Sequence, residues 1–257
     1  MKKMLTVLCL LLVAAVLFAG GKKEKIVINS ADDLVGRKIG VQTGTSGELF
    51  ATEEIKNAKV VGFKTGMDAA LDLKNGAIDL IVLDELPAKE IVKRNSDLTI
   101  VDLDLAIEEY AIAIKKGNPD LLNSINATIA AMKESGDYEK LVNAFMPVDG
   151  NITIPAAIAS TGTEIVKLGT NAAFPPFEYV EGSDIVGFDI TMGQRIAADY
   201  GKKLEVVNME FDSLIPALAS GAIDFIAAGM SVRSKLRCGM QVNNGVCFGV
   251  LGRALTA

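Results

Sequence analysis

Two stretches of the sequence follow one plan: ALDLKNGAIDLI at residues 70–81 and ALASGAIDFI at residues 217–226. In each, a helical pattern ends at a glycine, and a buried strand pattern starts directly after it. Any helix–strand unit of an α/β protein has this general form, so the similarity alone would also fit a chain without repeats. The shared Gly-Ala-Ile-Asp favours two similar lobes, because self-similarity is the signature of repeated architecture.

Strand and helix patterns alternate on both sides of these stretches. The predicted strands include residues 38–44, 58–64 and 78–84, and the predicted helices include residues 45–57, 66–76, 86–95 and 189–201. Residues 118–145 are predicted to form a pair of helices with a break near Ser135 and Gly136. Residues 147–162 have no hydrophobic period and are rich in Pro, Gly, Ser and Thr, so they are predicted to form a linker or a long surface loop. The alternation indicates an α/β fold with a largely parallel sheet.

Residues 1–21 have the organisation of a secretory signal peptide. Lys2 and Lys3 form a basic start, residues 5–18 are apolar, and residues 19–21 are small, as a cleavage site requires. A membrane anchor is the less favoured alternative, because the apolar run is short for a bilayer span. Gly20 is followed by Gly21 rather than by cysteine, so a lipid anchor is not supported. The sequence therefore predicts an exported protein.

The composition favours a binding protein over an enzyme. The chain has no histidine, which removes the triads that use histidine, most zinc sites and the commonest general base. We expect no catalytic residue, no metal and no cofactor. Loss of Lys2 and Lys3 with the leader leaves 24 basic and 32 acidic residues, which argues against nucleic acid as a partner. The spacing of Cys238 and Cys247 is compatible with a disulfide and equally with two free thiols.

Four segments together carry a resemblance to a known family. They are SADDLVGRKIGVQTGTSGELFA (30–51), GAIDLIVLDELPAKEIV (76–92), EEYAIAIKKGNPDLLNSINATIAAMKESGDYEKLVNAF (108–145) and GTNAAFPPFEYVEGSDIVGFDITMGQRIAADYGKKLEVVNMEFDSLIPALASGAIDFIAAGMSV (169–232). They resemble the periplasmic solute-binding proteins of polar-amino-acid ABC importers. The resemblance implies a type II periplasmic-binding-protein fold, in which two Rossmann-like lobes joined by a hinge close over an amino acid. It also implies a periplasmic location and a membrane ABC permease as partner, and we expect a monomer.

The order of the segments differs from the family. In the family the aromatic and proline-rich segment opens the mature chain, whereas here it follows the other half, so the chain resembles a circular permutant. A misjoined reading frame is the competing explanation. The expected lobes are residues 26–108, the family's second lobe, and residues 109–257, its first lobe, with a joining linker at 147–163. One crossing near 106–112 is then required, and the two chain ends are expected to pair across the hinge.

The resemblance also implies contacts for the charged groups of an amino acid. Asp84 matches the carboxylate that receives the ammonium group, although it would also suit a helix N-cap. Thr45 and Ser46 match the turn that meets the ligand carboxylate at a helix start, and plain capping would explain them equally well. Gly229 and Ser231 match a turn that contacts the ammonium group.

Four other residues match positions around the ligand's side chain. Phe174 and Phe211 match two aromatic residues that enclose it, whereas Phe177 is expected to pack beneath the loop. Asn171 and Gln42 lie where the family varies its specificity contacts. Amides there would suit a polar, uncharged side chain such as that of glutamine.

The segment 233–253 departs from the family. The family places an arginine five residues after the serine of the turn, where it binds the ligand carboxylate with two hydrogen bonds. Here that position is Leu236, and Arg237 is one residue late. A shift of one residue would restore the contact, and without it affinity should fall.

Two alternatives to an amino-acid-binding protein stay open. Some relatives of the fold are dehydratases that act on prephenate-like acids, and Glu178 or Glu85 could then act as the general acid, although no paired-carboxylate motif accompanies them. The other alternative is a misassembled chain with no ligand.

Overall fold

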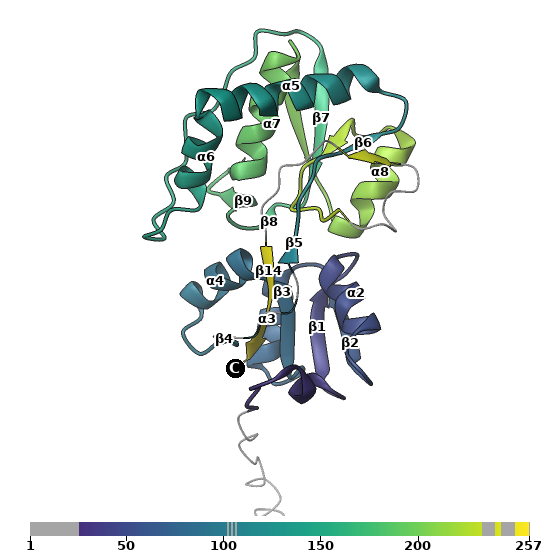
Figure 1. Ribbon diagram of the computed structural model, residues 1–257, viewed down its shortest axis with the longest axis vertical. Coiled ribbons are helices and arrows are strands. Elements are labelled where there is room, and N and C mark those ends of the chain that lie inside the picture. The colour runs from purple at the N-terminus through teal and green to yellow at the C-terminus, as the bar shows by residue number, and fades with distance from the viewer. Residues whose placement is uncertain are drawn as a thin grey trace, which may run out of the picture.

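The protein has two lobes, one above the other in Figure 1. The computed structural model describes residues 26–101, 103, 105, 107–232, 240–242 and 250–256. The proposed leader at 1–21, Arg237 and the two cysteines of the mature chain lie outside these residues. We call residues 26–101 together with 250–256 lobe A, and residues 110–232 together with 240–242 lobe B.

Lobe A is a mixed sheet with the strand order β2–β1–β3–β14–β4. Its strands are β1 (Lys38–Gln42), β2 (Lys59–Phe63), β3 (Leu80–Asp84), β4 (Thr99–Val101) and β14 (Val250–Thr256). Its helices are the 3-10 helix η1 (Ala31–Leu34), α2 (Ser46–Glu53), α3 (Gly66–Lys74) and α4 (Glu85–Arg94). β1 pairs in parallel with β2 and β3, so the carboxyl ends of these three strands share one edge, which faces lobe B.

Lobe B has a five-stranded sheet with the order β11–β7–β12–β6–β13 and a small sheet with the order β10–β9–β8. The strands are β6 (Ala113–Lys115), β7 (Ile165–Thr170), β8 (Ala173–Phe174), β9 (Glu178–Glu181), β10 (Asp184–Val186), β11 (Lys203–Asn208), β12 (Phe225–Ile226) and β13 (Met240–Val242). The helices are α5 (Pro119–Ser135), α6 (Asp137–Phe145), α7 (Phe188–Asp199), the 3-10 helix η2 (Phe211–Ser213) and α8 (Leu214–Ser220). β7 pairs in parallel with β11 and β12, so their carboxyl ends also share an edge.

The repeated stretches occupy equivalent places in the two lobes. α3 and α8 each end just before a glycine with positive φ, Gly76 at 66° and Gly221 at 81°. Glycine fits there because a side chain would strain this left-handed conformation. The Asp after each shared Ile bonds to a neighbouring strand, Asp79 to the backbone N–H of Lys38 and Asp224 to that of Lys167. The predicted α/β fold with two similar lobes is confirmed.

The prediction of which lobe contains the C-terminal strand was wrong. β14 was expected in the lobe of residues 109–257, but it lies in the sheet of lobe A, antiparallel to β3 and β4. Residues 26–30 form no strand, so they do not pair with it. The physical reason is that β14 pairs with the exposed edges of two strands at once, which satisfies more backbone groups than the expected pairing would.

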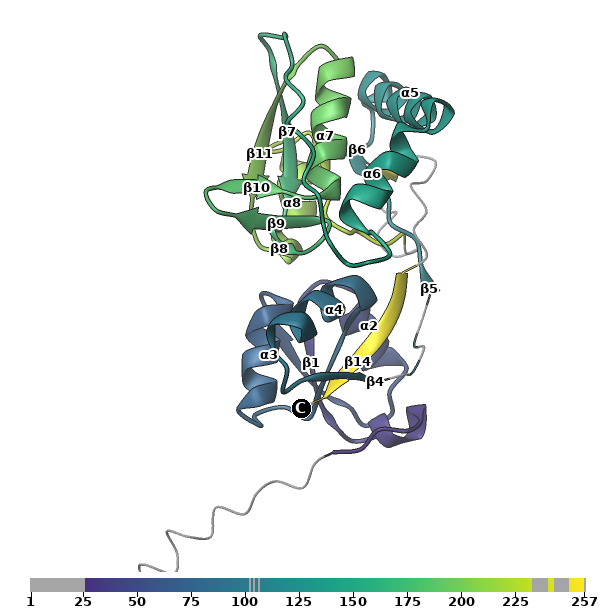
Figure 2. The same cartoon turned by 90° about the vertical axis from the view of Figure 1, so that its left-hand side faces the viewer.

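Two connections therefore join the lobes instead of one. β5 (Ile107–Glu108) leads from lobe A to lobe B, and the chain returns between β13 and β14. β5 pairs with the start of β14, where Leu251 faces Ile107 and Val250 faces Glu108. In Figure 2 β5 and the start of β14 lie on one side of the molecule, where the lobes meet. We refer to this pair of strands, which lies where the lobes are joined, as the hinge.

Apolar packing continues across the junction of the lobes. The largest cluster of buried side chains includes Leu83 and Ile91 of lobe A and Phe174 and Phe177 of lobe B.

In the part of the chain that the structure describes, no helix has both the length and the apolar character that a membrane span requires. The two facing edges of parallel strands are the places where α/β sheets hold ligands.

Candidate functional site

A cavity lies between the facing strand ends of the two lobes. Nine of the ten predicted site residues line it: Gln42, Thr45, Ser46 and Asp84 from lobe A, and Asn171, Phe174, Phe211, Gly229 and Ser231 from lobe B. The tenth, Arg237, lies outside the described residues. The other lining residues are Gly44, Leu49, Glu178, Ala228 and Met230.

Asp84 ends β3 and precedes the first residue of α4, but its side chain forms no capping hydrogen bond. The alternative interpretation as a helix cap therefore has no contact to support it. Burial raises the pKa of Asp84 to about 7; the nearby Tyr110 hydroxyl lowers it, and the charge of Glu108 raises it further. The Tyr110 hydroxyl is itself buried and forms no hydrogen bond of ordinary geometry. Asp84 thus presents a carboxyl group whose negative charge lacks a cationic partner among the described residues.

Thr45 and Ser46 use their hydroxyl groups within the protein. Thr45 is the N-cap of α2, where its Oγ1 accepts from the backbone N–H of Glu48 at 3.3 Å and donates to the carbonyl of Gln42 at 2.7 Å. Ser46 Oγ donates to Glu108 Oε2 at 2.6 Å. The capping interpretation therefore holds for Thr45, and only the N–H groups at the start of α2 remain as donors for an anion there.

Glu108 is a site residue that the sequence did not reveal. It lies in β5, in the hinge, and also accepts a hydrogen bond from Ser231 of lobe B. Ser46 Oγ and Ser231 Oγ are 3.5 Å apart. The carboxylate of Glu108 thus gathers one hydroxyl from each lobe, beside the cavity. No local pattern indicates this, because the two serines meet only when the lobes are together.

Two phenylalanines form apolar walls. Phe174 belongs to β8 and is almost fully buried, and Phe211, at the start of η2, also lines the cavity. Phe177 is fully buried behind Phe174, with ring centroids 6.0 Å apart and planes at 29°. It also packs edge to face against Tyr110. The expectation that Phe177 packs beneath the loop is confirmed.

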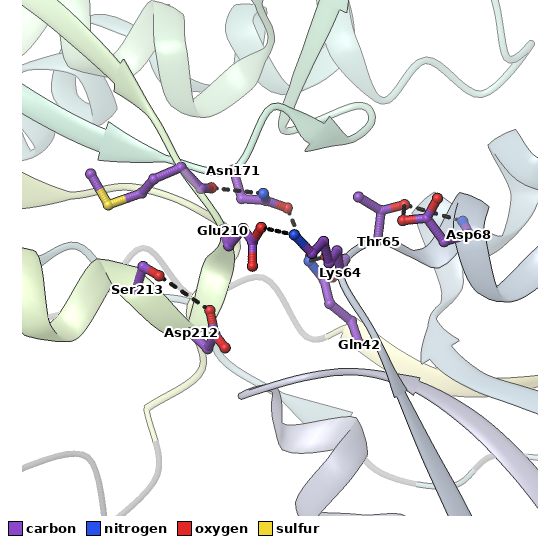
Figure 3. Close-up of polar contacts among 9 residues, drawn as sticks. Gln42, Lys64, Thr65, Asp68, Asn171, Glu210, Asp212 and Ser213 are labelled. Atoms are coloured by element: carbon purple, nitrogen blue, oxygen red, sulfur yellow. Dashed lines mark hydrogen bonds and ion pairs between the residues drawn. The ribbon is translucent and has the colours of Figure 1, made fainter.

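The two predicted specificity residues bind each other across the lobes. Gln42 Nε2 donates to Asn171 Oδ1 at 2.9 Å (Figure 3). The same Gln42 nitrogen donates to the carbonyl of Lys64 at 3.0 Å, and Asn171 Nδ2 donates to the carbonyl of Met209 at 2.8 Å. Each amide is thus held by a backbone carbonyl of its own lobe as well as by the amide of the other lobe.

A buried acid pair lies behind Gly229. Glu178 lines the cavity, has no exposed surface, and neither of its carboxyl oxygens has a hydrogen-bond partner of ordinary geometry among the described residues. Burial, with the nearby carboxylate of Asp189, raises its pKa well above the usual value. Burial also raises the pKa of Asp189 to about 6, opposed by the N–H of Gly229, which donates to Asp189 Oδ2 at 3.0 Å.

The turn at Gly229 is held tightly by its surroundings. Its φ is 54°, and a Cβ there would come within 2.8 Å of the Phe174 ring. Glycine is therefore required both by conformation and by space. Among the described residues no group of three or more acidic, cysteine or histidine side chains is arranged to hold a metal ion.

Residues 166–237 match the family model described as bacterial extracellular solute-binding proteins, family 3. This segment belongs to that family. The match covers lobe B from β7 through the turn at Gly229, and it confirms the resemblance that the sequence indicated. The family model thus begins at the strand that starts the second half of this chain.

Curated relatives include amino-acid-binding proteins. The L-cystine-binding protein TcyJ of Escherichia coli K12 is 33% identical over 129 residues, which cover 50% of this chain and 48% of TcyJ. The ABC transporter arginine-binding protein 1 of the same organism is 30% identical over 120 residues, which cover 45% of this chain and 49% of that protein. This chain therefore spans about half the length of the curated relatives that it matches. Among solved structures, the arginine-bound domain 1 from TmArgBP shares 32% identity, covers 35% of this chain and 79% of that domain, and has a TM-score of 0.29.

Proposed function

We propose that the cavity binds a polar L-amino acid and that the protein delivers it to an ABC permease after the lobes close. The observation that carries the proposal is Asp84, a carboxyl group at the end of β3 that faces a cavity between two lobes and is not used as a helix cap. An ammonium group would supply the partner that a buried carboxylate needs. The names of the relatives support an amino acid as the ligand.

The lining of the cavity favours some side chains over others. Its described residues carry two carboxyl groups, several hydroxyl and amide groups and two aromatic rings, and no cationic side chain. An acidic ligand side chain is therefore disfavoured. A glutamine-like side chain would need to share the amides that now bind each other, whereas a cationic side chain would be attracted by the carboxylate of Asp84. We propose that the ligand carboxylate lies at the start of α2, with Arg237 as its cation.

A thermal-shift panel of the common L-amino acids tests the proposal. A ligand at about 100 times its Kd stabilises the folded protein by about 2.7 kcal/mol, which raises the unfolding midpoint measurably. We expect one or more polar amino acids to do so. Asp84→Asn should lower the affinity by about 100-fold or more, because removing one partner of a buried charge pair costs about 3 kcal/mol or more.

The control for Asp84→Asn is Asp97→Asn, which changes an exposed aspartate of the same lobe that pairs with Lys74. Asp97→Asn should show the same shift of the unfolding midpoint with each amino acid as the wild type. If no amino acid raises the midpoint of the wild-type protein, or if Asp84→Asn responds as the wild type does, the proposal is wrong. Conversion of prephenate into an aromatic product, lost in Glu178→Gln, would favour the dehydratase alternative instead. Export through residues 1–21 and the monomeric state stay predictions.

A further inference from the structure

A second pair of side chains joins the lobes beside the Gln42–Asn171 amides. Lys64 of lobe A forms an ion pair with Glu210 of lobe B (Figure 3). Lys64 directly follows β2, and Glu210 lies two residues beyond β11. Their side chains are 72% and 47% exposed, whereas Gln42 is 4% exposed. Neither Lys64 nor Glu210 is among the residues that line the cavity.

The buried amide pair and the outer ion pair are supported by the same backbone segments. The carbonyl of Lys64 orients the Gln42 amide, and the carbonyl of Met209, the residue before Glu210, orients the Asn171 amide. In lobe A these segments are the ends of the neighbouring strands β1 and β2, and in lobe B they follow the neighbouring strands β7 and β11. Separation of the lobes at this point must therefore break both pairs together.

We propose that Lys64 and Glu210 form an interlobe latch that stabilises the closed arrangement of the lobes and so sets how tightly the ligand is retained, without contacting it. The proposal rests on the proposed function. Because the ion pair exists only when the lobes are together, it lowers the free energy of the closed arrangement relative to the open one. A more stable closed arrangement in turn raises the affinity for the ligand. This makes Lys64 and Glu210 positioning residues rather than ligand contacts.

The electrostatic surroundings of Lys64 fit this role. The pKa of Lys64 is raised, first by its hydrogen bond and charge interaction with Glu210, and further by the charges of Asp212 and Asp68. Lys64 therefore stays charged at neutral pH. Asp212 belongs to lobe B and Asp68 to lobe A, so the lysine is attracted from both sides. Because the pair is exposed, its contribution should be modest and should weaken as salt screens it.

The test compares ligand binding by the wild type, Lys64→Ala, Glu210→Ala and the exchanged double variant Lys64→Glu/Glu210→Lys. Both single variants should raise the Kd and the dissociation rate of the amino acid found in the thermal-shift panel by about two- to fivefold at low salt. The exchanged variant should restore only part of the affinity, because the charges of Asp68 and Asp212 lie near position 64 and repel a carboxylate there. At about 0.5 M salt the variants and the wild type should converge.

The matched control is Lys140→Ala. Lys140 is 76% exposed and pairs with Asp137 within α6, so both partners belong to lobe B. The Lys140→Ala variant loses an exposed ion pair of the same kind, and the loss does not affect closure of the lobes. Its Kd for the amino acid should therefore equal that of the wild type. A Kd that is unchanged in Lys64→Ala, or a loss that neither salt nor the exchanged variant reverses, would overturn the latch.

A ligand-free measurement separates this proposal from the proposed function. Spin labels on the two lobes report their separation without any amino acid present. We expect Lys64→Ala at low salt to show the larger separation that the wild type shows only at high salt. If the wild type binds no amino acid but this shift occurs, the proposed function fails and the latch stands. If the separations are equal at all salt concentrations, the latch is wrong whatever the ligand.

Discussion

At the scale of single residues, the proposed function needs a negative charge on Asp84, whereas the surroundings of Asp84 disfavour that charge. Burial raises its pKa to about 7, and the charge of Glu108 adds to the rise. An ammonium group in the cavity would favour the ionised form, so ligand binding should release a proton wherever Asp84 is partly protonated in the free protein. Ligand affinity then becomes a measure of the protonation of this one carboxyl group.

The resulting prediction concerns the pH dependence of binding. Affinity should be constant at high pH and fall as the pH drops through about 7, approaching tenfold for each further unit, because protonated Asp84 offers the ammonium group no charge. Isothermal titration between about pH 5.5 and 8.5, in buffers of different ionisation enthalpy, measures both the fall in affinity and the released proton. Constant affinity over this range would contradict the role given to Asp84.

Glu178 leads to a prediction about stability. Its pKa is raised in the folded protein, so between its unfolded and folded pKa values the folded state binds the extra proton. Glu178 therefore costs stability progressively as the pH rises above the unfolded value. Glu178→Gln has the shape of the protonated group and no charge to bury, so it should be more stable than the wild type at pH 8 and similar to it at pH 4.5.

Urea unfolding at the two pH values measures this difference. The control is Glu181→Gln, which removes an exposed glutamate from the other end of the same strand, β9. It should shift the unfolding midpoint little at either pH. If Glu178→Gln lowers stability at both pH values, then Glu178 is ionised in the folded protein and has a partner that the described contacts do not include.

At the scale of elements, the sequence predicted what depends on neighbouring residues. The helix pair at 118–145 breaks at Gly136, which has a φ of 77°, as its local pattern indicates. The glycines of the two repeated stretches, Gly76 and Gly221, follow the ends of α3 and α8. The same local signals locate the strand ends around the cavity, since a polar residue after a buried strand lies at an edge of the sheet.

Two elements could not be predicted because their partners lie far away in the sequence. β14 reads as a short apolar strand that either lobe would accept, and only pairing with β3 and β4 decides its place. β5 contributes Glu108, whose role depends on Ser46 and Ser231 arriving from opposite lobes. Non-local pairing of this kind leaves no periodic signal in either segment.

At the scale of the whole molecule, the resemblance in the sequence predicts that the two halves follow one another in a different order from the family. The curated relatives align with this chain over about half of their own length. The C-terminal end of β14 and the start of the described chain at residue 26 lie at the same end of lobe A in both views (Figures 1 and 2). Nearby ends make a circular permutation sterically simple, because a short loop can join them.

The segment that joins the halves, residues 147–163, lies against both lobes. The N–H of Thr153 donates to the carbonyl of Ala144, and that of Ile158 to Gln194 Oε1, so the segment follows α6 and then α7. Lys93 of α4 donates to the carbonyl of Gly150 at 3.1 Å, which ties the same segment to lobe A. No residue of the segment is fully buried, and none belongs to a helix or strand, so the lobes should not depend on the joining segment for their folding.

Relinking the chain tests this. A variant in which residue 256 leads through a short flexible loop to residue 26, with new ends opened between residues 156 and 157, has the order of the family. Its pairings within β1–β2–β3–β14–β4 and within β11–β7–β12–β6–β13 are unchanged, because each strand keeps its neighbours. We expect circular dichroism and the amino-acid profile to match the original chain, and unfolding free energy to change by no more than about 2 kcal/mol, since exchanging one surface loop for another alters closure entropy only slowly with length. A relinked chain that is insoluble, or that folds but loses the ligand response of the original, would show that the joining segment is an integral part of the fold and not a replaceable connection.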